Sequence, residues 1–198
     1  MKQNVPIFVR PERPQDHPAV FDVNLRAFGR PAEARLVELL RASARPNVSL
    51  VALADGKVVG HVLFTPLRIE GGPPRLAMGL GPLAVRPEYQ RQGIGSRLVN
   101  VGLDACRISA VDLVFVLGEP RLYRRLGFVP AQPYGLIYKN PSFAPYFMVR
   151  ELRPGSLADA TGQVHYHAEF DQMEAAAEQP AASHSGSSSR LGGGGCHV

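Results

Sequence analysis

Cysteine is scarce in this chain, and its two cysteines lie in different surroundings. Cys106 falls within an apolar helical pattern, whereas Cys196 follows a run of glycines near the end of the sequence. Cysteines placed in this way do not form the framework of a disulfide-stabilised domain, and they lack the spacing of metal ligands. The sequence therefore predicts neither a structural disulfide nor a metal site.

Long hydrophobic runs are also missing. No stretch reaches the roughly 18 consecutive apolar residues of a membrane span, and the N-terminal segment MKQNVPIFVRPERP lacks the apolar core of a signal peptide. With 45% hydrophobic and 20% charged residues among 198, the composition is that of an ordinary folded protein. We therefore expect a soluble cytoplasmic protein with no membrane partner.

Positive charge is in excess, but it is not concentrated in any one segment of the chain. The formal net charge is +5, and no block of five like charges occurs. A positive charge suits a polyanionic partner such as nucleic acid, a membrane surface or a phosphorylated cofactor. The basic residues are mostly arginines scattered along the chain without interleaved aromatic residues, and this pattern disfavours nucleic acid.

In the first part of the chain, the hydrophobic pattern predicts a strand, two helices and a hairpin. Alternation predicts a strand from Val5 to Arg10, and helical spacing predicts helices over 20–28 and 34–40. The dipeptide Asp55-Gly56 is a strong hairpin signal, which joins strands predicted at 49–54 and 57–66.

The middle of the chain reads as strand, loop, helix and strand. An apolar run over 76–85 contains Gly79, Gly81 and Pro82, which predict a strand whose ladder is interrupted. A helix is predicted from Gly95 to about residue 110, followed by a buried strand over 111–117. Such a segment ordinarily forms a right-handed parallel crossover, so the loop before the helix lies where ligands bind.

The last third of the chain predicts a short helix over 120–126 and strands over 146–152 and 164–170. Beyond Met173 the sequence is rich in Ala, Ser and Gly and cannot bury a core. We therefore predict one domain over residues 1–173 and a disordered tail over 174–198.

The loop at the crossover, EYQRQGIGSRLV, is rich in glycine and opens a helix. It lacks the third glycine of a dinucleotide-binding fingerprint, whose place is taken by Leu98, and it lacks the lysine of a Walker A loop. What remains is a helix N-terminus surrounded by Arg86, Arg91 and Arg97. Unpaired amides and the positive end of the helix dipole favour a phosphate there.

At these residues the sequence resembles the GNAT family of N-acetyltransferases. The segment 90–95, QRQGIG, matches the family's acetyl-CoA motif Q/R-x-x-G-x-G/A, and 123–128, YRRLGF, matches its Y-x-x-x-G-F element. Residues 83–87 resemble its central splayed strand, and 162–167 resemble an uncharacterised bacterial branch. The resemblance runs from Val5 to Met173. It implies an α+β fold in three layers, with helices on both faces of a mixed sheet that is splayed at the acetyl-CoA site.

The resemblance also implies how acetyl-CoA is held as the co-substrate, with no metal. The main chain of Leu83, Ala84 and Val85 would bond the pantetheine arm as a substitute strand. The backbone amides of the loop would cradle the pyrophosphate, and they belong to Arg91, Gln92, Gly93, Ile94, Gly95 and Ser96.

Direct acetyl transfer to an amine requires the loss of a proton before attack, because an alkylammonium has a pKa of about 10.4. By the family match, Tyr123 would protonate the departing thiolate; its alternative role is an aromatic anchor. The strand over 76–85 has no carboxylate, so Glu119 and Glu88 are the candidate general bases. The ordinary role of Glu119 is an acid in the first turn of a helix.

Other polar residues have simpler interpretations. His165 and His167 alternate along a strand, but without a third ligand we expect solvated side chains rather than a metal site. His61 is expected on a strand face in the same way. Arg121, Arg124 and Arg125 are expected on a solvated helix face, with contact to the cofactor's phosphates as the alternative.

These features predict an N-acetyltransferase that moves an acetyl group from coenzyme A to a primary amine of a small molecule or protein. A non-catalytic acyl-CoA sensor and a basic nucleic-acid adaptor on the same fold are the alternatives. Tyr123 favours catalysis over sensing. The sequence leaves open the identity of the acceptor and whether the chain forms a homodimer.

Overall fold

The structure is a computed structural model that describes residues 6–178, with side chains described through Met173. The elements in chain order are β1 (Ile7–Pro11), α1 (His17–Phe28), α2 (Ala32–Ser43), β2 (Val48–Ala54), β3 (Lys57–Glu70), β4 (Ala77–Val85), α3 (Ile94–Ile108), β5 (Leu113–Leu117), α4 (Pro120–Arg124), β6 (Val129–Pro130), β7 (Leu136–Tyr138), β8 (Phe147–Glu151), β9 (Gly162–His165) and α5 (Ala168–Glu178), with short 3-10 helices at Pro14–Asp16, Pro87–Tyr89, Gln132–Tyr134 and Pro141–Phe143.

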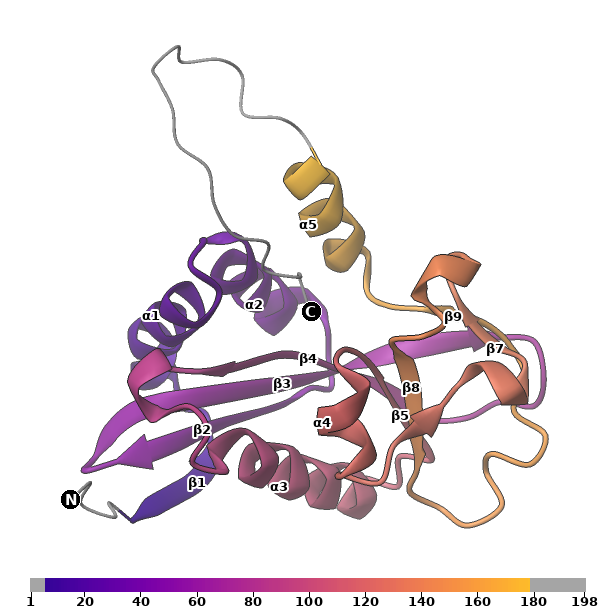
Figure 1. Cartoon of the computed structure of the whole chain (residues 1–198), viewed down its shortest axis with the longest axis horizontal. Coiled ribbons are helices and arrows are strands. Elements are labelled where there is room, and N and C mark those ends of the chain that lie inside the picture. The colour runs from indigo at the N-terminus through magenta and orange to yellow at the C-terminus, as the bar shows by residue number, and fades with distance from the viewer. Residues whose placement is uncertain (1–5, 179–198) are drawn as a thin grey trace.

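The strands form one mixed sheet in the order β1-β2-β3-β4-β5-β8-β6, and β9 pairs with the far half of β3 and with β7. Helices α1, α2 and α5 lie on one side of the sheet, and α3 and α4 lie on the other (Figure 1). The predicted α+β architecture with helices on both faces is therefore confirmed. Among residues 6–178, no helix is long and apolar enough to cross a membrane.

The crossover predicted in the middle of the chain is present. Strands β4 and β5 pair in parallel, with α3 between them in sequence, while β3 and β4 pair antiparallel. The Asp55-Gly56 hairpin joins β2 to β3, with Asp55 and Gly56 at φ angles of 48° and 74°. Strand β3 runs to Glu70, beyond the predicted end, because its last residues pair with β9.

Strands β4 and β5 separate halfway along β4. Their last registered pair is Leu80 with Val116, whereas β4 stays paired with β3 as far as Val85. The next residues are Gly81, at a φ of 155°, and Pro82, which has no N–H to donate to a ladder. The predicted irregularity thus lies at Gly81-Pro82, and it opens one edge of β4 from Leu83 onward.

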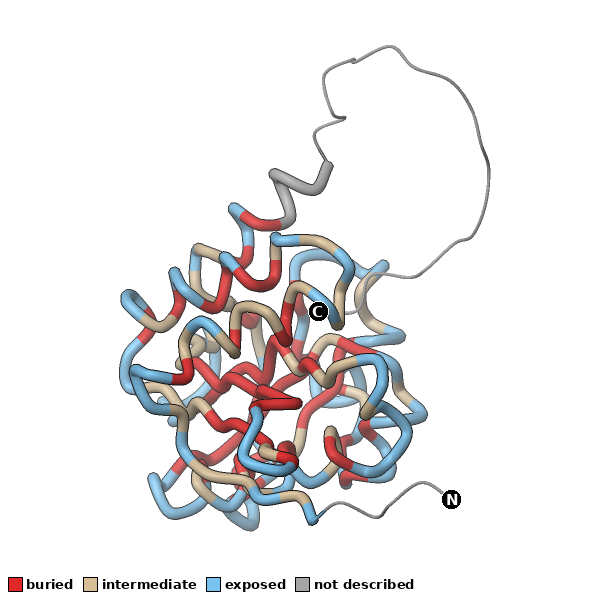
Figure 2. Tube along the Cα trace, turned by 90° about the vertical axis from the view of Figure 1, so that its left-hand side faces the viewer, coloured by how far each residue is buried: buried red, intermediate tan, exposed pale blue. Residues whose placement is uncertain are grey.

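The core fills both sides of the sheet, and the buried residues concentrate along the central strands (Figure 2). On the α3 side, Phe64, Leu98 and Val114 belong to one buried cluster. On the opposite side, α1 packs through Val20 and Val23, and α2 packs through Leu36 and Leu40. Cys106 is buried within α3 as a free thiol.

Two predictions for the end of the chain need correction. The predicted strand over 164–170 ends at His165, and Phe170 belongs to α5. Phe170 and Met173 are three residues apart, so a helix presents both to α2, where they pack with Leu36 and Leu40. The helix continues through Glu178, past the predicted start of the tail at 174. The remainder of that tail, with Cys196, lies outside the described residues.

Candidate functional site

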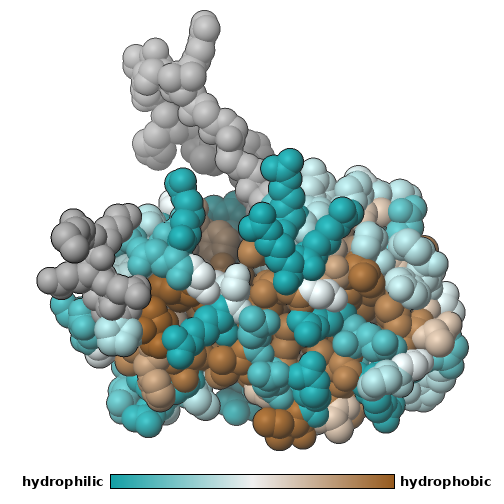
Figure 3. Space-filling view, turned by 60° about the horizontal axis from the view of Figure 1, so that its bottom comes forward, coloured by the Kyte–Doolittle hydropathy of each residue, from teal (hydrophilic) through white to brown (hydrophobic). Residues whose placement is uncertain are grey.

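A groove lies where β4 has separated from β5. It has a volume of about 580 Å³, and its lining residues are Leu83, Val85, Tyr89, Gln90, Arg91, Gly93, Ile94, Gly95, Ser96, Leu122 and Arg125. The segment between β4 and α3 supplies most of these residues, and Leu122 and Arg125 come from α4 and its end. In Figure 3, which brings the α3 and α4 side of the molecule forward, apolar residues lie between projecting hydrophilic ones.

The open edge of β4 presents main-chain groups to this groove. Along a strand, successive residues direct their N–H and C=O groups to opposite sides. The Arg86 N–H donates to the Val59 carbonyl on β3 at 2.9 Å, so the groups of Ala84 also face β3. Those of Leu83 and Val85 therefore face the opening. The side-chain amide of Gln90 donates to the Val85 carbonyl at 2.9 Å, which agrees with this orientation.

The N-terminus of α3 forms the other side of the groove. Gly93 is the N-cap of this helix at a φ of 79°, a left-handed conformation that glycine adopts without strain. No side chain caps the helix, and its first intrahelical bond runs from the Arg97 amide to the Gly93 carbonyl. The amides of the first turn are thus available to an anion, which the helix dipole also favours.

The groove brings together the predicted cofactor residues except Ala84 and Gln92. Ala84 packs its side chain against α1 instead, and Gln92 donates to the Glu88 carbonyl at 3.3 Å. Of the nearby arginines, Arg91 and Arg125 line the groove, whereas Arg86 pairs with Asp22 at 2.5 Å. Sequence reasoning missed Tyr89 and Leu122, whose only signal was their position beside the two motifs.

Tyr123 lies on α4 and is almost fully buried, with 5% of its surface exposed. Its ring contacts that of Phe128 edge to face at 5.6 Å, and the Phe128 amide donates to the Tyr123 carbonyl at 3.1 Å. Burial raises the pKa of the phenol above its ordinary value of 10. The residue is thus an aromatic anchor, as the alternative interpretation held, and it also carries a phenol that stays protonated at neutral pH.

The two candidate bases are both exposed. Glu119 is the N-cap of α4 and accepts a hydrogen bond from the Arg121 amide at 3.3 Å, which is the ordinary role expected from its position. Glu88 lies 3.9 Å from Arg86 in the turn after β4. Neither contact indicates a proton acceptor.

Among the described residues, no group of three or more His, Cys, Asp and Glu side chains is placed to hold a metal ion. His165 contacts Glu70 at 3.0 Å, and His167 contacts Glu169, so each has a carboxylate partner of its own. His61 lies on a face of β3 as expected, but the prediction that it is solvated is wrong: the side chain is buried, because α1 covers this part of β3.

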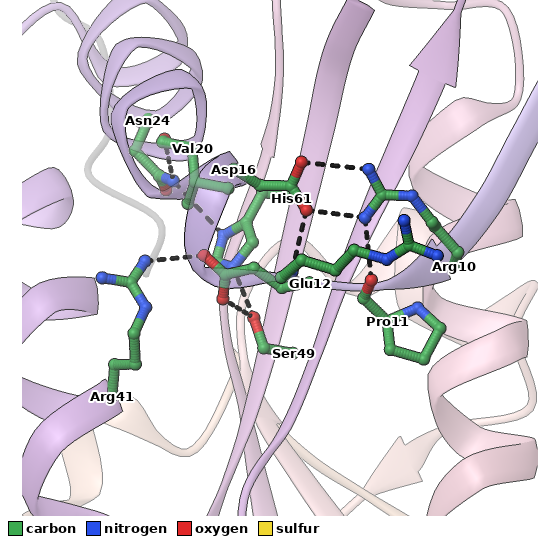
Figure 4. A network of polar contacts seen from close by, with 10 residues as sticks. Arg10, Pro11, Glu12, Asp16, Val20, Asn24, Arg41, Ser49 and His61 are labelled. Carbon is green, nitrogen blue, oxygen red and sulfur yellow. Dashed lines mark hydrogen bonds and ion pairs between the residues drawn. The ribbon is translucent and has the colours of Figure 1, made fainter. Parts of the chain in front are cut away.

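His61 belongs to a buried polar network between α1, β2 and β3 (Figure 4). Its Nε2 lies 3.0 Å from the Ser49 hydroxyl, which donates to Glu12 at 2.5 Å. Arg41 pairs with the same carboxylate at 2.7 Å. Burial lowers the pKa of His61 to about 4, so the ring is neutral at pH 7.

The split sheet, the glycine loop and α4 define the class of this protein, and comparison with known sequences agrees. Residues 9–131 match the family model described as the acetyltransferase (GNAT) domain. The chain belongs to the GNAT family and is an N-acetyltransferase.

Two bacterial proteins are similar to this chain along most of its length, and crystal structures are known for both. The uncharacterised N-acetyltransferase YhbS of Escherichia coli (strain K12) is 36% identical over 168 residues, which is 84% of this chain and 100% of that protein. The crystal structure of Escherichia coli YhbS in complex with CoA superposes with a TM-score of 0.80 at 34% identity and covers 86% of this chain and 95% of that one. A GNAT family acetyltransferase from Brucella melitensis, solved with acetyl-CoA, has a TM-score of 0.69 at 34% identity and covers 85% of this chain and 100% of the other.

Proposed function

We propose that this chain moves an acetyl group directly from acetyl-CoA to a primary amine in the cytoplasm. One observation carries the proposal: the open edge of β4 and the uncapped N-terminus of α3 line the same groove. The first would bind the pantetheine arm, and the second its pyrophosphate. The relatives solved with CoA and acetyl-CoA support this choice of co-substrate.

In the reaction, the nitrogen lone pair of a neutral amine attacks the carbonyl carbon of the thioester. The C–N bond forms, negative charge develops on the carbonyl oxygen, and the C–S bond then breaks. The Leu83 and Val85 amides point into the opening, so one of them would donate to the developing oxyanion. Such a preorganised donor is ordinarily worth about 100- to 1,000-fold in rate.

The departing thiolate needs a donor, and Tyr123 is our candidate. Because burial keeps its phenol protonated, Tyr123 would donate a hydrogen bond to the sulfur as charge develops there. The proton lost by the amine goes to water or to a carboxylate. Among the candidate general bases, Glu119 is the nearest in sequence to Tyr123. Its side chain caps α4 instead, so we favour water as the acceptor of the amine's proton.

Release of thiol in the presence of acetyl-CoA and an amine tests the proposal. The panel would comprise lysine, spermidine, an aminoglycoside and a peptide with a free N-terminus. We expect one of these classes to accelerate thiol release, with the acetylated amine detected by mass spectrometry. Tight binding of acetyl-CoA without acetyl transfer to any amine would instead identify an acyl-CoA sensor.

A further inference from the structure

The hydroxyl groups of Tyr166 and Thr65 are buried without a hydrogen-bond partner among the described residues. Tyr166 lies between β9 and α5, and Thr65 lies on β3. A buried hydroxyl without a partner is destabilising, so native proteins retain few of them. Neither side chain lines the cofactor groove.

Both residues lie beside Gly79 on β4. Thr65 is the registered partner of Gly79 on β3, so the Thr65 side chain projects to the face on which a side chain at Gly79 would lie. The ring of Tyr166 occupies that space, and a Cβ added to Gly79 would overlap it. The missing side chain at Gly79 is thus what admits the Tyr166 ring to this face of the sheet.

This position is next to the split in the sheet. Gly79 immediately precedes Leu80, whose pairing with Val116 is the last between β4 and β5. Tyr166 packs with α2 and α5, while Tyr123 belongs to the cluster on the α3 side. They therefore approach the split from opposite faces of the sheet.

We propose that Tyr166 and Thr65 form the acceptor side of the active site and hydrogen-bond the amine nitrogen beside the thioester carbon. The inference rests on the proposed function. The Tyr166 oxygen would accept an N–H of the attacking amine and leave its lone pair directed at the carbonyl, while Tyr123 serves the sulfur from the other face. The Tyr166 side chain packs beside α2 and α5, on the face of the sheet opposite Tyr123.

The surroundings of Tyr166 keep its hydroxyl neutral. Burial, with smaller contributions from Tyr138 and Tyr123, raises its pKa well above 10. The phenol is therefore a positioning group, because a base would need to ionise near neutral pH.

The decisive variant is Tyr166→Phe, with Thr65→Val as a second and Tyr134→Phe as the matched control on an exposed tyrosine outside the cofactor groove. If the hydroxyl binds only the acceptor, its removal relieves an unpaired buried group, and the melting temperature rises by about 2–4 °C. At the same time, kcat/KM for the acceptor falls about 2- to 10-fold, the effect of one lost neutral hydrogen bond. The dissociation constant of acetyl-CoA stays unchanged. In the control Tyr134→Phe, the melting temperature, the acceptor kcat/KM and the dissociation constant of acetyl-CoA all stay at their wild-type values.

A merely structural role predicts the opposite pattern. A lower melting temperature in Tyr166→Phe, or an unchanged kcat/KM for an amine that the wild type acetylates, would overturn the inference while leaving the proposed function in place. A wild type that binds acetyl-CoA but acetylates no amine of the panel would overturn the proposed function and the acceptor role together.

Gly79→Ala is a second, independent test of the inference, because the added methyl displaces the Tyr166 ring without removing its hydroxyl. We expect the same selective loss of acceptor kcat/KM, without the gain in melting temperature. Normal acceptor kinetics in a folded Gly79→Ala would contradict the inference.

Discussion

The side-chain amide nitrogen of Asn24 lies 3.2 Å from Nδ1 of His61 and 2.9 Å from the Val20 carbonyl. Because this nitrogen is a donor, Nδ1 accepts, and the ring carries its proton on Nε2. The Nε2–H then donates to Ser49, whose hydroxyl donates to Glu12. A histidine that donates to serine cannot take the serine proton, so Ser49 and His61 are not a nucleophilic pair. They join α1 to the sheet.

This network makes stability depend on pH. The pKa of His61 is about 4 in the folded protein and about 6.5 when unfolded, mainly through burial; the Glu12 charge raises it and Arg41 lowers it. The unfolded state binds more protons between these values, so the stability is full above pH 6.5 and falls as the pH approaches 4. We expect a loss of up to about 3 kcal/mol in the free energy of unfolding. Urea unfolding across this range measures it.

The matched comparison is His61→Gln against His165→Gln. His61→Gln removes the buried titrating ring, so the free energy of unfolding should change less between pH 6.5 and pH 4. The second changes a partly exposed histidine on β9 and should retain the wild-type slope. Equal slopes in wild type and His61→Gln would show that other groups govern the acid response.

Acetyl-CoA should stabilise the protein through the groove. At about 100 times the dissociation constant, a ligand adds about 2.7 kcal/mol, which corresponds to a rise in melting temperature of about 5–10 °C. Gly93→Val should abolish this rise, because a β-branched residue cannot adopt the φ of 79° at the α3 N-cap. Gly29→Val is the control, with a φ of 69° at the end of α1. An acetyl-CoA shift that survives in Gly93→Val would place the cofactor elsewhere.

Tyr123→Phe tests the role of the phenol. Phenylalanine retains the ring that contacts Phe128, so the fold and the affinity for acetyl-CoA should change little. If the phenol donates to the thiolate, kcat should fall by about 100-fold or more. Steady-state rates with an identified acceptor and a cofactor titration measure the two quantities. Turnover like that of wild type would leave Tyr123 as an anchor only.

Phe170→Ala tests the docking of α5 on α2. Phe170 is 2% exposed, and its ring lies 5.1 Å from that of Tyr166. Removing a buried phenylalanine ordinarily costs about 3–5 kcal/mol, and the loss should appear in the unfolding midpoint. Phe8→Ala, at a side chain 62% exposed on β1, is the control and should change stability little. Equal losses in both variants would argue against a packed α5.

The strongest sequence predictions concerned segments whose local chemistry leaves few alternatives. Asp55-Gly56 favours positive φ angles at both positions and so predicts the hairpin, and Gly81-Pro82 interrupts a ladder whatever surrounds it. The sequence analysis predicts a strand over 164–170, although the apolar residues of so short a run fit a helix equally well. Docking of Phe170 and Met173 on α2 decided in favour of the helix.

The sequence by itself determined the order of the elements from β1 to α4, the break in β4 and the glycine loop at the start of α3, because each depends on residues adjacent in the chain. Only the tertiary structure decided which main-chain groups of β4 face the opening, since that depends on pairing with β3. It also decided that His61 is buried and that Tyr166 lies against Gly79, 87 residues away in sequence. Contacts between distant segments follow from how the layers pack, and a gap left by a missing side chain carries no signal of what will fill it.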